Sequence, residues 1–331
     1  MTRSSSLWWF ALAAIVFAFP RSSPAPLVYQ PGEGWTYEAV EGGSSWKRDR
    51  AKDQIAVAEA AYGLQDYSLA LRAAKYTVRK WPQSDYAAPA QYLVGQCYEA
   101  KKNDEKAFKA YEVLLHKYPN STNIENALQR EFEIANRFLA GQWFKLWGII
   151  PFFSSMDKTS LLYQQIVNNG PYSPVGPQSQ MNIGSARDKQ KAWEQAAKAY
   201  EIAIFRYIDR PVIASEAFYK AGKSYERQAL KAEYDQSAAG KAILAFSDFN
   251  TLYPNDPRVP KAKEYIALLK GEQARGAYQT ALYYQKRNKL RAASIYFGNV
   301  LKLDPKSSYE AEARQRIDEI NKKITATTVA K

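Results

Sequence analysis

Small and apolar residues recur along the chain at helical spacing, and a proline often ends the run. In the clearest set, Ala107, Tyr111 and Leu114 share one face of a helix, and Pro119 stops that helix because proline cannot continue it. The same offsets recur at four further places: Ala70, Ala74 and Pro82; Ala196 and Tyr200; Ala242, Phe246 and Pro254; Ala293, Phe297 and Pro305. This pattern predicts a series of similar helices that each pack through one face.

A small residue on an earlier helix precedes most of these sets. The instances are Gly95 with Tyr98, Gly184, Gly222 with Tyr225, and Ala281 with Tyr284. A glycine lets a second helix approach closely, and a small–large contact closed by a proline turn is typical of the tetratricopeptide repeat. The sequence therefore predicts an all-α fold, a tetratricopeptide-repeat α-solenoid of about six helix pairs in a right-handed superhelix. No sheet is expected between residues 50 and 320.

The distances between prolines locate the repeats. An uninterrupted unit has about 34 residues, whereas Pro119 and Pro171 are 52 residues apart, so we expect an insertion at 141–158. The solenoid is expected over 50–320, with repeats near 51–84, 88–121, 125–171, 177–210, 214–256 and 274–307. Region 258–287 has one apolar stripe, which predicts a single long helix serving the fifth and sixth repeats. Residues 321–331 are expected to form a C-terminal tail.

The amino terminus has a different pattern. Arg3 precedes an unbroken apolar run of 13 residues from Leu7 to Phe19, shorter than the roughly 20 residues that a membrane span needs. Residues 1–25 are therefore predicted to be an export signal. An uncleaved N-terminal anchor is an alternative, because Pro26 directly after Ala25 makes a poor cleavage site, and a cytosolic helix is a third. Residues 26–49, rich in Pro, Gly, Ser and Trp, are predicted to form an extended leader.

The net charge limits the possible partners, and the single cysteine and single histidine limit the possible chemistry. A formal net charge of +13 favours acidic partners or an anionic membrane face, and export argues against nucleic acid. One cysteine, Cys97, excludes an internal disulfide, and one histidine, His116, excludes a multi-histidine metal site. The tripeptide 222–224 resembles the end of a phosphate-binding loop, but Ala217 stands where that loop requires its first glycine. We expect no enzymatic activity, no cofactor and no metal.

Two surfaces are predicted to meet partners. Stacked repeats leave a concave face lined by the first helix of each pair, which suits an extended peptide. Its candidate residues are Ile55, Glu59, Tyr62, Tyr92, Gln96 and Glu99.

The insertion holds a dense aromatic cluster, with Trp143, Trp147 and Phe152 as candidate anchors. It could cover the solenoid interior, dock a partner or dip into a membrane; we favour covering, because an interrupted solenoid leaves an apolar end exposed.

Several stretches resemble a known family. They are Ala245-Phe246-Ser247-Asp248-Phe249, Leu252-Tyr253-Pro254-Asn255, and Ala281-Leu282-Tyr283-Tyr284 with Arg287. Together with Trp81-Pro82 and Tyr118-Pro119, they resemble the BamD (YfiO) family, the helical-repeat lipoproteins of the outer-membrane β-barrel assembly machine. The resemblance covers about residues 50–318. Two features depart from it: no lipid-attachment cysteine follows the apolar run, and the chain is longer by about one repeat.

The resemblance implies a non-enzymatic scaffold on the periplasmic side of the outer membrane, acting in assembly of β-barrel proteins. It implies protein partners: a BamA-type subunit at the carboxy-terminal repeats and unfolded outer-membrane proteins in the amino-terminal groove, with no nucleic acid. Membrane association is compatible with it, although the lipidation cysteine is missing. Another periplasmic repeat scaffold, such as a cell-division or peptidoglycan-linked coordinator, is the alternative.

Overall fold

The computed structural model describes residues 27–30, 34–37, 46–146, 150–231 and 236–329. These ranges hold thirteen α-helices and two small antiparallel sheets of two strands each, and most of the described residues are helical. The all-α class predicted from the repeated helical pattern is therefore confirmed. The right-handed twist of the superhelix stays a prediction.

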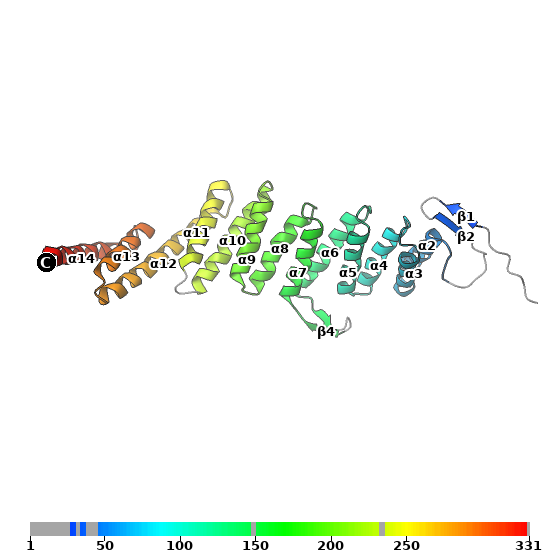
Figure 1. The fold of residues 1–331 in the computed structure, drawn as a ribbon, viewed down its shortest axis with the longest axis horizontal. Helices are drawn as coiled ribbons and strands as arrows, with labels where there is room; N and C mark the ends of the chain where they lie inside the picture. Colours follow the sequence, from blue (N-terminus) through cyan, green and yellow to red (C-terminus); the bar gives the residue numbers. More distant parts are fainter. Residues whose placement is uncertain (1–26, 31–33, 38–45, 147–149, 232–235, 330–331) are drawn as a thin grey trace, which may run out of the picture. The chain divides into compact units, whose positions relative to one another are not determined.

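The chain divides into two compact units, the first ending at Asn123. The first unit holds a hairpin of β1 (Leu27–Gln30) and β2 (Gly34–Tyr37), followed by two helix pairs. The first pair is α2 (Ala51–Gly63) with α3 (Tyr67–Lys80), and the second is α4 (Ala87–Ala100) with α5 (Asp104–Lys117). Within this unit, α3 packs against α2 and α4, and α4 packs against α5 (Figure 1).

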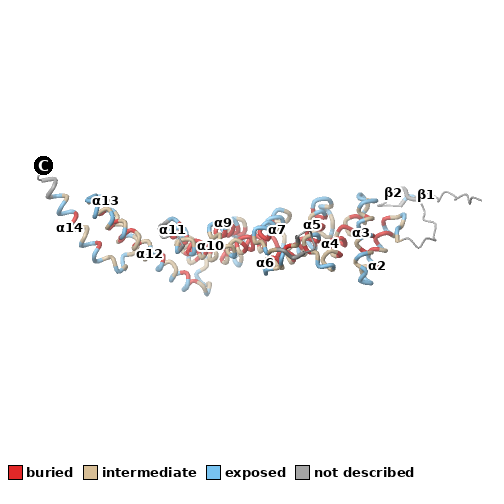
Figure 2. The backbone as a smooth tube through the Cα atoms, turned by 90° about the horizontal axis from the view of Figure 1, so that it is seen from below, coloured by how far each residue is buried: buried red, intermediate tan, exposed pale blue. Residues whose placement is uncertain are grey.

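The second unit holds four more pairs and a final helix. The pairs are α6 (Ile124–Leu139) with α7 (Met156–Asn169), α8 (Gly176–Lys189) with α9 (Trp193–Arg206), α10 (Pro211–Lys231) with α11 (Gln236–Leu252), and α12 (Val259–Lys286) with α13 (Leu290–Leu303); α14 (Glu310–Val329) follows. Buried residues lie along the helix–helix seams and exposed residues at the turns (Figure 2). Both units are thus built from one repeated motif.

The turn inside a helix pair has a repeated backbone conformation. Gln65, Lys102, Lys191 and Asn288 have φ values of 62°, 53°, 59° and 54°, in the left-handed region that costs a non-glycine residue about 1–2 kcal/mol. In the first two pairs the following residue caps the second helix. Asp66 accepts a hydrogen bond from the Leu69 backbone N–H, and Asn103 accepts one from that of Lys106. The cap offsets the backbone cost and fixes where the second helix begins.

The 28-residue helix α12 belongs to two repeats, as the uninterrupted apolar stripe predicted. Its first half places Val259, Ala262 and Leu269 in one core cluster with α10 and α11. Its second half places Ala274 and Ala281 in a separate cluster with α13 and α14. The helix is therefore the second wall of the fifth repeat and the first wall of the sixth.

Three local expectations differ from the structure. The prediction of no sheet between 50 and 320 is wrong, because β3 (Phe144–Leu146) pairs with β4 (Ile150–Phe153) inside the insertion. Two short aromatic and β-branched runs on either side of a glycine can pair locally without a long strand signal. In the leader, β1 and β2 pair as a hairpin rather than running singly. In the predicted tail, residues 321–329 continue α14 as helix.

Candidate protein-interaction surfaces

A glycine–aromatic contact closes the seam of three helix pairs. An added Cβ on Gly95 would lie 2.3 Å from Tyr111 Cε1, one on Gly184 would lie 2.4 Å from Tyr200 Cε1, and one on Gly222 would lie 2.7 Å from Phe246 Cε1. Tyr111, Tyr200 and Phe246 are fully buried. The ring therefore occupies the volume that any other side chain would take, as the small–large pattern predicted.

In each seam that has a tyrosine, the tyrosine hydroxyl donates a hydrogen bond to a carboxylate in the last turn of the preceding helix. Tyr111 donates its hydroxyl to Glu99 at 2.7 Å, and Tyr200 donates to Asp188 at 2.9 Å. Burial, followed by the nearby Asp188 charge, raises the pKa of Tyr200, so the phenol stays neutral and remains a donor at physiological pH. These contacts fix the helix-pair geometry on which the outer surfaces depend.

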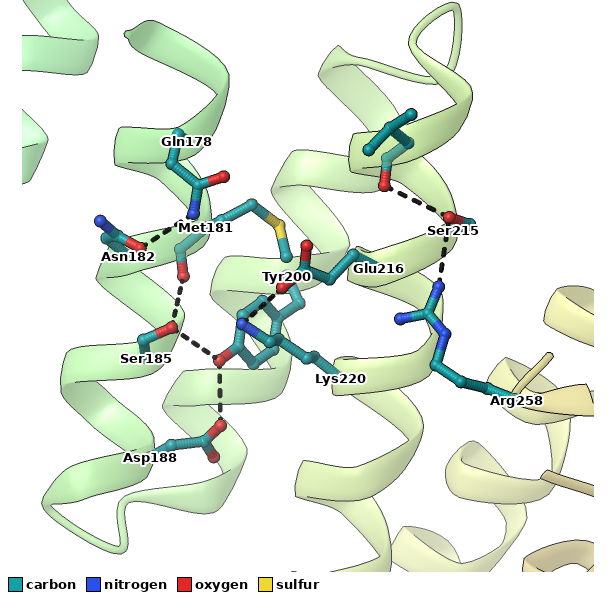
Figure 3. A network of polar contacts seen from close by, with 11 residues as sticks. Gln178, Met181, Asn182, Ser185, Asp188, Tyr200, Ser215, Glu216, Lys220 and Arg258 are labelled. Carbon is teal, nitrogen blue, oxygen red and sulfur yellow. Dashed lines mark hydrogen bonds and ion pairs between the residues drawn. The ribbon is translucent and has the colours of Figure 1, made fainter. Parts of the chain in front are cut away.

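Asp188, whose contact with Tyr200 is drawn in Figure 3, also joins neighbouring repeats. Its second carboxylate oxygen accepts a hydrogen bond from the buried Ser224 hydroxyl at 2.8 Å, so one carboxylate links α8, α9 and α10. At the far end of α10, Arg258 Nη2 lies 3.4 Å from Ser215 Oγ and also pairs with Asp256 at 2.7 Å. Ser224 thus connects the fourth pair to the fifth, and Arg258 connects the fifth pair to the start of the sixth.

A groove of about 920 Å³ opens between the fifth and sixth repeats. Its α12 wall presents Leu269, Gln273, Gly276, Thr280 and Tyr283, which follow one another at steps of three or four residues. The opposite walls come from α10, α11 and α13, with Leu230, Tyr296 and Lys302 among the lining residues. Sequence reasoning missed this groove, although the helical stripe from 269 to 283 was its visible signal.

A second surface is an apolar patch on the outside of the fourth repeat. Phe205 is 89% exposed, and Ile202, Ile208, Val212 and Tyr172 are also exposed. Tyr172, Ile202 and Phe205 line a shallow depression of about 610 Å³ together with polar side chains of α9. Large apolar side chains gathered in one place on a surface usually mark an interaction site. We call Tyr172, Ile202 and Phe205 the Phe205 patch.

The six predicted groove residues of the first unit have unequal surroundings. Ile55 is 5% exposed and lies in the core, so it offers little surface to a peptide. Glu59 is exposed, and Gln96 is half-buried. The tyrosines are half-buried and engaged: Tyr62 packs edge-on against Tyr67, with ring centroids 5.4 Å apart, and Tyr92 packs on Tyr111 at 5.5 Å. As a peptide-binding surface, these residues stay a prediction.

The aromatic insertion divides into a buried part and an exposed part. Phe144 is 3% exposed and stacks on Phe138 of α6 with ring centroids 4.0 Å apart. Trp143 is 55% exposed. Trp147 lies outside the described residues, as does the side chain of Phe152. Phe144 is therefore the residue by which this insertion packs onto the solenoid helix α6. It was not among the predicted anchors.

The residues weighed for catalysis serve structural roles. Cys97 is buried, and burial raises the pKa of its thiol to about 11, which keeps it protonated and unreactive. His116 contacts Glu112 at 3.2 Å on an exposed helix face. Lys223 pairs with Glu226 at 2.9 Å.

Within the described ranges, no three His, Cys, Asp or Glu side chains are placed to hold a metal ion. In the same ranges, no helix is long and apolar enough to span a bilayer.

The fold and these surfaces define a tetratricopeptide-repeat protein. A tetratricopeptide-repeat family model matches residues 89–121. The model of the YfiO family, described as "Outer membrane lipoprotein", matches residues 160–331, slightly more than half of the chain. The chain belongs to the YfiO family. Both families are non-catalytic scaffold families, and the chain is a tetratricopeptide-repeat scaffold for protein–protein interaction.

Three solved structures are similar to this chain at low sequence identity. MamA is 14% identical over 61% of this chain and 94% of its own, with a TM-score of 0.33. A tetratricopeptide repeat protein from Parabacteroides merdae is 12% identical over 82% and 98%, with a TM-score of 0.32. The apo form of RapI is 14% identical over 81% and 99%, with a TM-score of 0.31. TM-scores this low carry no argument about this chain. No curated protein matches the sequence.

Proposed function

We propose that this scaffold acts on the periplasmic side of the outer membrane in the assembly of β-barrel proteins, by binding a BamA-type subunit and unfolded substrate proteins. The observation that carries the proposal is the YfiO match over residues 160–331. That span contains the whole groove between the fifth and sixth repeats and the whole Phe205 patch. The family match and the principal recessed surface therefore coincide in one part of the chain.

The groove has the chemistry of a protein-binding site. Leu230 and Tyr283 line it and are 57% and 52% exposed, so apolar area is available for burial by a partner. Glu272 and Arg275 lie on the same wall, 2.8 Å apart, and can orient a polar backbone or side chain. A few polar groups beside an exposed apolar floor are typical of recognition grooves. We assign the BamA-type subunit to this groove.

The first unit would receive the unfolded substrate. This assignment rests on the resemblance described above and on the prediction that Glu59, Gln96 and Glu99 of α2 and α4 line a concave face. Extended segments of an unfolded chain suit a helical-repeat surface, because side-chain contacts can be made along the length of a peptide.

Affinity capture from an envelope extract tests the proposal. Tagged wild-type protein is expected to recover a BamA-type subunit, and Leu230→Glu with Tyr283→Glu is expected to lose it. Ile295→Glu is the matched control, because Ile295 is 63% exposed on α13 and does not line the groove. Recovery of cell-division or peptidoglycan-linked proteins without any BamA-type subunit would favour the alternative scaffold function. Equal recovery by the groove variant and the control would move the binding site elsewhere.

A further inference from the structure

Three aromatic rings meet on the surface of the first unit, next to the start of α2. Tyr76 on α3 lies between Trp46 and Trp81, with ring centroids 5.8 Å from each and interplanar angles of 78° and 88°. All three rings are half-buried. Each therefore has an apolar body packed on the protein and an edge at the surface.

Four exposed cations lie over these rings. Arg72 is 5.7 Å from the Trp46 centroid, and Lys80 is 4.6 Å from that of Trp81. Lys47 and Arg79 each lie 5.8 Å from the Tyr76 centroid. Cations at these distances are attracted to the ring faces while they keep their charge and their contact with water. We call these seven residues the basic aromatic patch: Trp46, Lys47, Arg72, Tyr76, Arg79, Lys80 and Trp81.

Positive charge dominates the surroundings of the patch. Helix α3 carries four cations and no acid, and residues 46–53 carry four cations against two acids. Asp49 pairs loosely with Lys80 at 3.8 Å, and Asp53 pairs with Arg50 at 2.6 Å. Asp49 thus pairs with a cation of the patch and Asp53 with a cation outside it, and the eight cations of the two segments still exceed their two acids by six.

We propose that the basic aromatic patch binds the anionic surface of a phospholipid bilayer. Arg72, Tyr76, Arg79 and Lys80 are spaced by four, three and one residues, so they lie along one helix face over roughly 12 Å. Half-buried Trp and Tyr side chains favour the membrane–water interface, and Lys and Arg beside them pair with lipid phosphates. The proposal depends neither on the proposed function nor on how the amino terminus is attached.

Single-stranded nucleic acid is the other polyanion that aromatic and basic residues bind. Its bases require open ring faces for stacking. Here the Tyr76 ring already has Lys47, Arg79 and Lys80 within 6 Å of its centroid, and its two ring neighbours meet it edge-on. With the rings occupied in this way, the patch offers charge to phosphates but little stacking area to bases.

Vesicle sedimentation of the full-length protein tests the proposal. The readout is the ratio of partition coefficients on vesicles of phosphatidylcholine with phosphatidylglycerol and on vesicles of phosphatidylcholine alone, so any contribution of the apolar amino-terminal run cancels. Arg72→Gln, Arg79→Gln and Lys80→Gln together are expected to lower this ratio on the order of 100-fold, about fivefold for each cation. Arg72→Lys with Arg79→Lys keeps the charge and is expected to change the ratio by less than about twofold.

The control removes the same charge elsewhere in the unit. Lys106→Gln, Lys109→Gln and Lys117→Gln act on exposed cations of α5 and are expected to lower the ratio far less than the patch variant. Equal losses in the two triple variants would overturn the proposal in favour of a general effect of net charge. An equal ratio for wild type and patch variant would also overturn it. Loss of labelled single-stranded oligonucleotide binding in the patch variant, with vesicle binding unchanged, would reassign the patch to nucleic acid.

Discussion

Gly184 lies directly beneath the ring of Tyr200. A Cβ built on the glycine would approach Tyr200 Cε1 to 2.4 Å, well inside van der Waals contact. The ring has no room to retreat, because it is fully buried and its hydroxyl is held by Asp188 at 2.9 Å. One hydrogen atom in place of a side chain therefore sets the distance between α8 and α9.

Replacement of this glycine by alanine should destabilise the protein. We expect Gly184→Ala to lower the free energy of unfolding by about 1–3 kcal/mol, because the added methyl overpacks a rigid seam. Gly298→Ala is the control: its Cβ would meet nothing within 4 Å, and alanine in a helix should raise stability by about 0.4–1 kcal/mol. Urea unfolding followed by circular dichroism measures both. Shifts of the same sign in the two variants would contradict the seam geometry.

Removal of the Tyr200 hydroxyl isolates its hydrogen bond from the packing of the ring. Tyr200→Phe should lower stability by about 1–2 kcal/mol, since Asp188 loses one of its donors. A phenylalanine ring fits at this position, because Phe246 occupies the equivalent position over Gly222 in the next helix pair. Tyr283→Phe, at a side chain that is 52% exposed, should leave the urea midpoint unchanged. An unaltered midpoint in Tyr200→Phe would mean that the contact with Asp188 adds nothing to stability.

The aromatic insertion should respond differently at two adjacent residues. Phe144→Ala is expected to cost about 3–5 kcal/mol, because it removes a buried ring stacked on Phe138. Trp143→Ala, at a residue that is 55% exposed, should change stability by less than about 0.5 kcal/mol. Thermal unfolding distinguishes the two. A larger loss in Trp143→Ala would show that the exposed tryptophan, rather than Phe144, covers the solenoid.

The Phe205 patch should matter for binding and not for folding. Phe205→Glu introduces a charge at a position that is 89% exposed, so the melting temperature should stay within the range of neutral surface substitutions. Capture of partners from an envelope extract should fall if the patch is a contact surface, because a buried unpaired carboxylate opposes association. Ile295→Glu is again the matched substitution. Full capture by Phe205→Glu would exclude the patch from the interface.

Acid should weaken the junction between the fifth and sixth repeats. Hydrogen bonds from Arg258 hold the pKa of Asp256 below its ordinary value. A depressed carboxyl pKa contributes stability above the unfolded-state pKa of about 3.9, and that contribution is lost as the pH falls through the lower folded value. The stability difference between wild type and Asp256→Asn should therefore be constant from pH 7 to about 5 and shrink below about 4. A difference that grows in acid would contradict this sign.

Regular repeats were predictable from the sequence because their signals are local. Gly95 with Tyr111, and Gly184 with Tyr200, are small–large pairs with the same offset of 16 residues, and that offset indicates a helix seam. The long helix α12 was predictable for a similar reason, since its apolar stripe continues from Ala262 to Ala281 without a proline. In both cases the packing partner lies on an adjacent helix and the spacing alone identifies the face.

Surfaces were harder to predict because burial depends on more than one helix. Ile55 was expected to face a groove, but its neighbours in the first unit enclose it. Phe205 lies three positions after Ile202 on the same face of α9, and both side chains are exposed, although large apolar residues at helical spacing usually indicate a buried face. The hairpin of β3 and β4 escaped prediction because strands of three and four residues are too short for alternation to be read.

Helix α12 also limits where the protein can be divided. Removal of residues from Val259 onward would strip Val259, Ala262 and Leu269 from the core they share with α10 and α11. A cut between Leu269 and Ala274 would sever the helix that joins this core to the cluster of Ala274 and Ala281 with α13 and α14. Stepwise unfolding of a repeat array normally stops at a boundary between repeats. Here the last two repeats have no such boundary, so protection of their amides from hydrogen exchange should be lost in a single cooperative event.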